Sequence, residues 1–78
     1  MKKWDTIRAR SKIILKTDKE FMTLDGLRVI PKGEYFINGF WANAVGLCRP
    51  KDWDYKQQEG LNFACISSID LKQFEGIK

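Results

Sequence analysis

The segment EFMTLDGLRVIPKGEYFINGFW, residues 20–41, decides the fold because it places three turn signals among short apolar runs. Asp25-Gly26 and Asn38-Gly39 are typical of two-residue β-hairpin turns, in which both central residues need positive φ. Between them, Pro31 restricts φ and Gly33 tolerates a left-handed conformation, which marks a third connection. The segment therefore predicts a series of short antiparallel strands.

The first predicted hairpin, around Asp25-Gly26, has a register that its apolar residues support. Pairing outward from this turn sets Leu24 opposite Leu27 and Met22 opposite Val29. These four side chains then share one apolar face, because neighbours directly across a hairpin lie on the same side.

The second predicted hairpin, around Asn38-Gly39, carries aromatic rings on both faces. Pairing outward from this turn sets Phe36 opposite Trp41. Either Tyr35 and Phe40 line the core while Phe36 and Trp41 face outward, or the reverse. In a further interpretation the outward rings form a second small cluster beneath another tryptophan, Trp4 or Trp53.

The N-terminal segment TIRARSKIILK, residues 6–16, alternates with a period of two, as a half-buried strand does. One face carries Ile7, Ala9, Ser11, Ile13 and Leu15. The other face carries Arg8, Arg10, Lys12 and Lys16, interrupted only by Ile14. The pattern predicts a strand with a basic outer row.

The second half of the chain completes the predicted sheet. Residues 44–49 continue the preceding strand, with Gly46 at a bulge or a close approach, and residues 61–69 form another strand. The polar residues 50–60 indicate either a helical turn, begun at Asp52 and ended at Gly60, or a plain loop. Ser67 or Ser68 is expected to cap a short closing turn that packs Leu71 and Phe74 onto the core.

These elements predict one mainly β domain spanning residues 1–78, with at most one or two short helical turns. At this length we expect a small antiparallel barrel of five or six short strands, SH3-like rather than OB-like, because closing the sheet leaves no unpaired edge strands. An open antiparallel sheet covered by one short helix is the alternative.

Composition argues against several classes of function. The chain has no histidine and two cysteines, Cys48 and Cys65, without a CxxC motif, so we expect no metal site, no cofactor and no enzymatic activity. Both thiols are interpreted as core residues, and Asp52 and Asp54 as solvated charges. The longest apolar run, residues 40–48, is far shorter than the ~20 residues of a membrane helix, so we expect a cytoplasmic protein without membrane contact.

The uneven distribution of charge suggests a partner. Residues 1–16 carry six basic residues and one acidic residue, a net +5, whereas residues 17–78 carry eight basic and nine acidic residues, a net −1. Basic side chains in a row along a strand are suited to a phosphate backbone, and an exposed aromatic ring to stacking on bases. The predicted nucleic-acid contacts are Lys3, Arg8, Arg10, Lys12, Lys16 and Trp41.

A protein partner is the alternative prediction. Its contacts are the aromatic residues Phe36, Trp41, Trp53 and Tyr55. Such a module is an adaptor, or an inhibitor of a host protein of the kind that phages and mobile elements encode. A homo-oligomer formed through the aromatic face is a third hypothesis, and no small-molecule substrate is expected.

Overall fold

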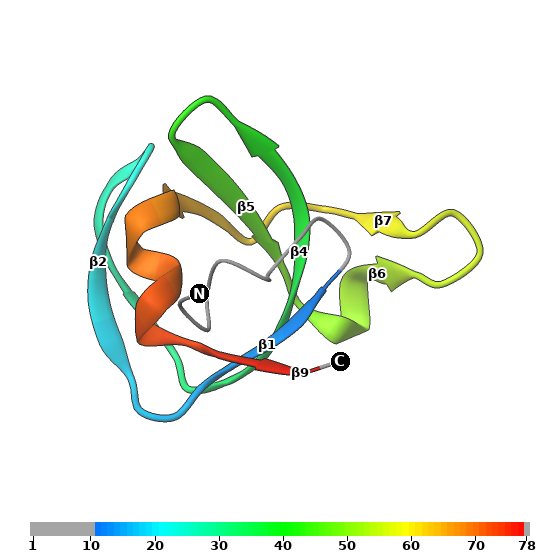
Figure 1. Cartoon of the computed structure of the whole chain (residues 1–78), viewed down its shortest axis with the longest axis horizontal. Helices are drawn as coiled ribbons and strands as arrows, with labels where there is room; N and C mark the ends of the chain where they lie inside the picture. Colours follow the sequence, from blue (N-terminus) through cyan, green and yellow to red (C-terminus); the bar gives the residue numbers. More distant parts are fainter. Residues whose placement is uncertain (1–10, 78) are drawn as a thin grey trace.

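The computed structural model of this protein describes residues 11–77, in nine strands and two 3-10 helices (Figure 1). The strands are β1 (Lys12–Leu15), β2 (Lys19–Thr23), β3 (Gly26–Ile30), β4 (Gly33–Trp41), β5 (Ala44–Cys48), β6 (Trp53–Asp54), β7 (Glu59–Gly60), β8 (Ala64–Ser67) and β9 (Glu75–Ile77). The 3-10 helices are η2 (Pro50–Asp52) and η3 (Ser68–Gln73). The prediction of a mainly β chain with little helix is confirmed.

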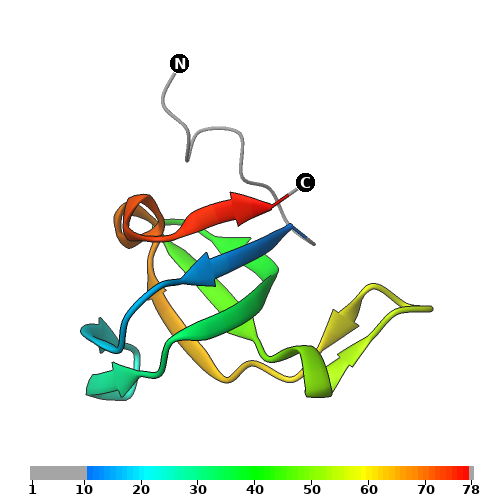
Figure 2. The ribbon, with the colours of Figure 1, turned by 90° about the horizontal axis from the view of Figure 1, so that it is seen from below.

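Seven strands form one curved antiparallel sheet in the order β3-β2-β8-β5-β4-β1-β9. β3 and β9 are its two ends and do not pair with each other, so hydrogen bonding does not close the sheet into the barrel that the sequence suggested. The described residues also contain more strands than the five or six expected. β6 and β7 pair separately and project from the body as a small arm (Figures 1 and 2).

The concave side of the sheet holds the main core, with η3 packed beside it. The core consists of Ile13, Leu15, Phe21, Ile30, Tyr35, Ile37, Val45, Leu47, Ala64, Ile66, Leu71 and Phe74. The predicted inward face of the first strand is confirmed at Ile13 and Leu15, both fully buried. The predicted closing turn is confirmed too, because the Ser67 hydroxyl accepts a hydrogen bond from the Ile69 amide, and Leu71 and Phe74 are buried.

The first hairpin occurs where expected, but its predicted register is wrong. Thr23 pairs with Gly26, and Met22 pairs with Leu27, so Leu24 and Asp25 are the central residues of the turn. Neither central residue has positive φ, whereas Gly26, the first residue after the turn, has φ +103°, a conformation that favours glycine. The Thr23 hydroxyl stabilises this turn by accepting from the Asp25 amide (3.1 Å) and donating to the Gly26 carbonyl (2.7 Å).

The second predicted hairpin is wrong, because residues 33–41 form one continuous strand, β4. The side chain of Asn38 donates to the Gly60 carbonyl (2.7 Å) and to Asn62 Oδ1 (2.9 Å), and it accepts from the Gly60 amide (3.1 Å). These tertiary bonds hold Asn38 at a β-bulge, where the register with β5 shifts, instead of in a turn. The chain reverses later, after Trp41, where Ala42 takes φ +49°.

The segment 50–60 is neither a capped helical turn nor a plain loop. η2 ends at Asp52, and the next residues pair as Trp53 with Gly60 and Asp54 with Glu59. The Asp54 carboxylate accepts hydrogen bonds from the Lys56 and Gln57 amides (2.9 and 3.1 Å), which stabilises the turn between β6 and β7. This carboxylate therefore has a structural role in the arm.

Candidate functional site

A large apolar area lies on the outer side of the sheet, away from the main core. Alternation along β2 and β3 buries Phe21 and Ile30 and turns their neighbours outward. The outer apolar surface, as we call it, consists of Met22, Leu24, Leu27, Val29 and Trp41, which are 61%, 78%, 61%, 61% and 50% exposed. The predicted shared face is thus confirmed for Met22, Leu27 and Val29, and it is the solvent-exposed face, whereas Leu24 lies in the turn.

Trp41 belongs to this surface because of the bulge at Asn38. The extra residue reverses the alternation along β4, so that Phe36 and Trp41 lie on the outer side although five positions separate them. The indole lies over two glycines that face each other across β4 and β5. An ideal Cβ on Gly39 would lie 3.4 Å from the indole, and one on Gly46 only 2.8 Å. The close approach expected at Gly46 is therefore confirmed.

A groove of about 440 Å³ separates the indole from the tip of the first hairpin. Its lining residues are Met22, Thr23, Leu24, Trp41, Ala42, Asn43, Ala44, Cys65, Ile66 and Ser67. None of them carries a formal charge at neutral pH. The groove therefore connects Met22 and Leu24 of the hairpin with Trp41.

Two of the aromatic residues predicted to contact a partner are instead buried. Trp53, from β6, stacks on Phe36 with ring centroids 4.5 Å apart and planes 8° apart, and each is 6% exposed. With Cys48 they form a second small core, as one interpretation of the sequence anticipated for Phe36 and Trp53. Tyr55 contacts Phe36 edge-on and is 64% exposed. Of the aromatic residues named for a protein partner, Trp41 and Tyr55 thus remain accessible.

The cysteines occupy different environments. Both are free thiols, Cys48 buried and Cys65 partly exposed in the groove. Burial raises the pKa of the Cys48 thiol, and the nearby Asp52 carboxylate raises it further. The expectation of two core thiols is thus confirmed for Cys48 alone.

The predicted basic row is only partly within the described residues. Lys3, Arg8 and Arg10 lie outside them. Lys12 pairs with Glu34 (3.5 Å) and its ammonium lies 5.7 Å from the centre of the Phe36 ring, while Lys16 pairs with Glu75 (3.2 Å). Residues 11–77 carry nine basic and nine acidic residues, so the part of the chain that the structure describes is neutral overall.

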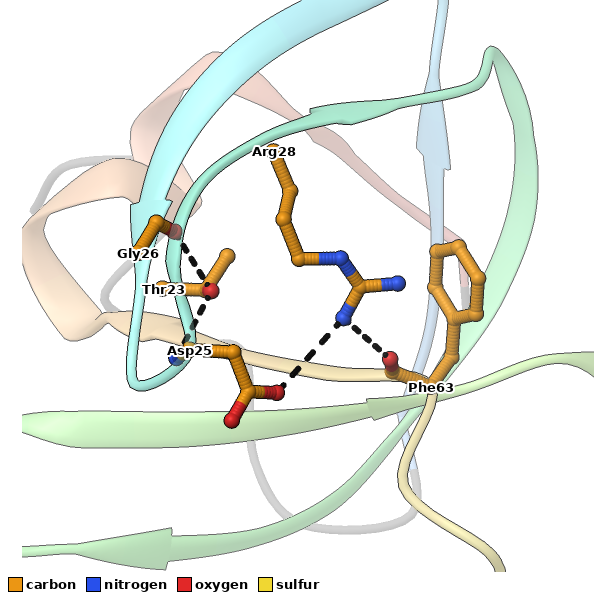
Figure 3. Close-up of polar contacts among 5 residues, drawn as sticks. All are labelled: Thr23, Asp25, Gly26, Arg28 and Phe63. Atoms are coloured by element: carbon orange, nitrogen blue, oxygen red, sulfur yellow. Dashed lines mark hydrogen bonds and ion pairs between the residues drawn. The ribbon is translucent and has the colours of Figure 1, made fainter.

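A second basic site, which the sequence did not reveal, lies around Phe63. The Arg49 guanidinium lies 3.8 Å from the centre of this ring and the Arg28 guanidinium 5.0 Å from it. Arg28 also donates to the Phe63 carbonyl (3.0 Å) and lies 3.9 Å from the Asp25 carboxylate (Figure 3). Arg49 also lines a groove together with Lys32 and Lys51. We call Arg28, Lys32, Arg49, Lys51 and Phe63 the basic mouth.

Tyr35 supports this mouth from the core side. Its ring stacks on Phe63 with centroids 5.9 Å apart, and its hydroxyl donates to the Pro31 carbonyl (2.6 Å). Burial raises the pKa of this phenol, and the positive charge of Arg49 opposes part of that rise. The phenol therefore stays protonated at neutral pH and acts as a donor that fixes the 31–35 segment.

Features of other site types are scarce in residues 11–77. No three His, Cys, Asp or Glu side chains there lie close enough together to hold a metal ion. No helix in this part of the chain is long and apolar enough to cross a membrane.

No protein-family model, curated protein or solved structure matches this chain.

Proposed function

We propose that this protein is a non-catalytic binding module that recognises a partner protein through the outer apolar surface. The observation that carries the proposal is the exposure of five large apolar side chains on one side of a small sheet. Isolated exposed apolar residues are common, but a contiguous area rimmed by polar residues is typical of interaction sites.

Trp41 is the expected anchor of this contact. Tryptophan is enriched among the residues that dominate binding energy, and this indole already lies against the sheet, over two glycines that leave room for it. A ring fixed before binding loses little conformational entropy on association. Complete burial of each exposed Leu or Met by a partner would contribute about 1.5–3 kcal/mol before the costs of association.

The proposal is tested by capture from a nuclease-treated lysate with immobilised protein. Met22→Lys places a charge in the outer apolar surface, and Ile69→Lys is the matched control, because Ile69 is also 61% exposed but lies on η3. We expect wild type and Ile69→Lys to retain the same protein, and Met22→Lys and Trp41→Ala to lose it while still folding. Equal retention by all four, or retention by none, contradicts the proposal.

Nucleic-acid binding through the N-terminal basic row remains a second proposal, favoured by the net +5 charge of residues 1–16. Lys12 and Lys16 pair with Glu34 and Glu75, and a phosphate backbone would have to compete with these carboxylates. Replacing Arg8, Arg10 and Lys12 together by Gln should lower the slope of log affinity against log salt by up to about three. An absence of binding at low salt contradicts this proposal.

The finer class of the module also belongs to the proposal. We propose that the module is SH3-like and cytoplasmic. We also propose that it acts as an adaptor or as a phage-type inhibitor of a host protein. Homo-oligomerisation through the outer apolar surface is the competing outcome. Light scattering on the purified chain distinguishes it, since a dimer would double the mass and Met22→Lys would restore the monomer.

A further inference from the structure

We propose that the basic mouth is a binding site for a phosphate group. This inference does not depend on the outer apolar surface, because the two sites share no residue. Arg28 lies between Leu27 and Val29 on β3, but alternation along the strand turns it to the opposite face. It rests on the placement of two guanidinium groups against one ring, on the balance of charge around them, and on an open groove beside them.

The two guanidinium groups are held close together by Phe63. Both contact the same ring, at 3.8 and 5.0 Å from its centre, so their carbons lie no more than about 9 Å apart. A guanidinium stacked on an aromatic face keeps its in-plane N–H groups free to donate. Arg49 follows β5 directly, and stacking on Phe63 restrains its side chain before any ligand arrives.

Acidic groups do not neutralise this cluster. Asp25 is 3.9 Å from Arg28, at the limit of an ion pair, and its carboxylate is 82% exposed. Within residues 11–77, Lys32, Arg49 and Lys51 form no ion pair with a carboxylate. Glu34 pairs with Lys12, and Asp18 accepts the backbone N–H of Lys32 (2.7 Å). The cluster therefore carries an excess of positive charge that an anion would offset.

A groove of about 430 Å³ gives a ligand access to three of these cations, Lys32, Arg49 and Lys51. It is lined by Pro31, Lys32, Gly33, Glu34, Tyr35, Arg49, Pro50 and Lys51. Lys32 and Lys51 line this groove together with Arg49, so three cationic side chains border it. A phosphate group, with three or more acceptor oxygens and up to two negative charges, satisfies such a set of donors better than a carboxylate does.

The test uses ¹⁵N-labelled full-length protein and inorganic phosphate, followed by the NMR signals of the arginine side chains. We expect the Arg49 Nε–H signal to shift in a saturable titration. Lys51→Gln, at an exposed position, should weaken the apparent affinity about tenfold, as expected for loss of one charge-assisted contact. Arg49→Gln removes this reporter, so its effect is followed at the Arg28 Nε–H signal, which should no longer shift. Lys72→Gln, an equal charge change on η3, should leave the response unchanged.

A parallel titration with a short oligothymidylate identifies the source of the phosphate. Tighter binding of the oligonucleotide than of inorganic phosphate, at equal phosphate concentration, assigns the site to a nucleic-acid backbone. Equal or weaker binding assigns it to a small phosphorylated molecule. No response, or the same loss for Lys51→Gln and Lys72→Gln, overturns the proposal. Met22→Lys should bind phosphate normally, so the result stands apart from that of the protein-partner test.

Discussion

Replacing Gly46 by Ala tests whether the backbone of β5 determines the position of Trp41. The added Cβ would lie 2.8 and 3.0 Å from two indole carbons and 2.5 Å from Asn62 Oδ1, closer than such atoms can approach. Gly46 does not have positive φ, so the expected cost is steric and does not arise from backbone strain. Overpacking of this kind costs about 1–3 kcal/mol of unfolding free energy.

Because Trp41 is half exposed, the indole can relieve the contact by swinging away from the sheet. The outer apolar surface would then lose its anchor without any change at Trp41 itself. We expect the Trp41 indole N–H signal, assigned with Trp41→Phe, to move towards the position of a solvated indole. Chemical denaturation should show the loss of stability in the same sample.

Gly39→Ala is the matched control, since its Cβ would lie 3.4 Å from the same indole, near ordinary contact distance. We expect Gly39→Ala to change stability by less than about 1 kcal/mol and to leave the indole signal in place. In a Trp41→Ala background, Gly46→Ala should cost less than in wild type, because only the contact with Asn62 remains. An unchanged indole signal in Gly46→Ala, or an equal cost in both backgrounds, would refute this account of the surface.

Three further changes probe other parts of the structure. Asn38→Ala removes the side chain that joins the bulge to residues 60–62, so the Gly60 amide and carbonyl lose their hydrogen bonds to it. Equilibrium denaturation should show a loss of about 1–3 kcal/mol of unfolding free energy. Gln57→Ala, on the exposed arm, is the control and should cost almost nothing. Trp53→Ala opens a cavity beside Phe36 and should cost about 3–5 kcal/mol, and an unchanged midpoint would show that the second core is dispensable. The raised pKa of Cys48 means that the unfolded thiol ionises first, so the unfolding free energy should decline as pH rises through 9.0, and Cys48→Ala should flatten that decline. In the native protein, Cys65 should react with an alkylating reagent well before Cys48, and equal rates would contradict the burial of Cys48.

Local patterns in the sequence predicted the parts of the site that depend on one strand. The placement of Met22 opposite to Phe21, and of Leu27 and Val29 opposite to Ile30, follows from the pleat of each strand and needs no knowledge of neighbours. The residue pattern predicted an apolar face for this hairpin but did not indicate whether that face is buried or exposed. The structure decided it by packing Phe21 and Ile30 into the main core.

The basic mouth had no signal in the sequence. Arg28 and Phe63 are 35 residues apart, and Arg49 lies on a different strand connection from either. Each taken alone resembles an ordinary surface cation or an apolar residue at the start of a strand. The predicted basic row at residues 8–16 was more conspicuous. Its described members, Lys12 and Lys16, form ion pairs with Glu34 and Glu75, which come from other strands.

The sequence by itself determined the class of fold, the inward face of β1 and the capped closing turn, because these depend on side-chain alternation and on hydrogen bonds between residues close along the chain. The tertiary structure alone decided the register of the first hairpin and the face on which Trp41 lies. Asn38 and Gly39 have a strong local preference for a turn, but three hydrogen bonds to residues more than 20 positions away keep them in a strand. The single residue added by that bulge places the indole on the outer surface.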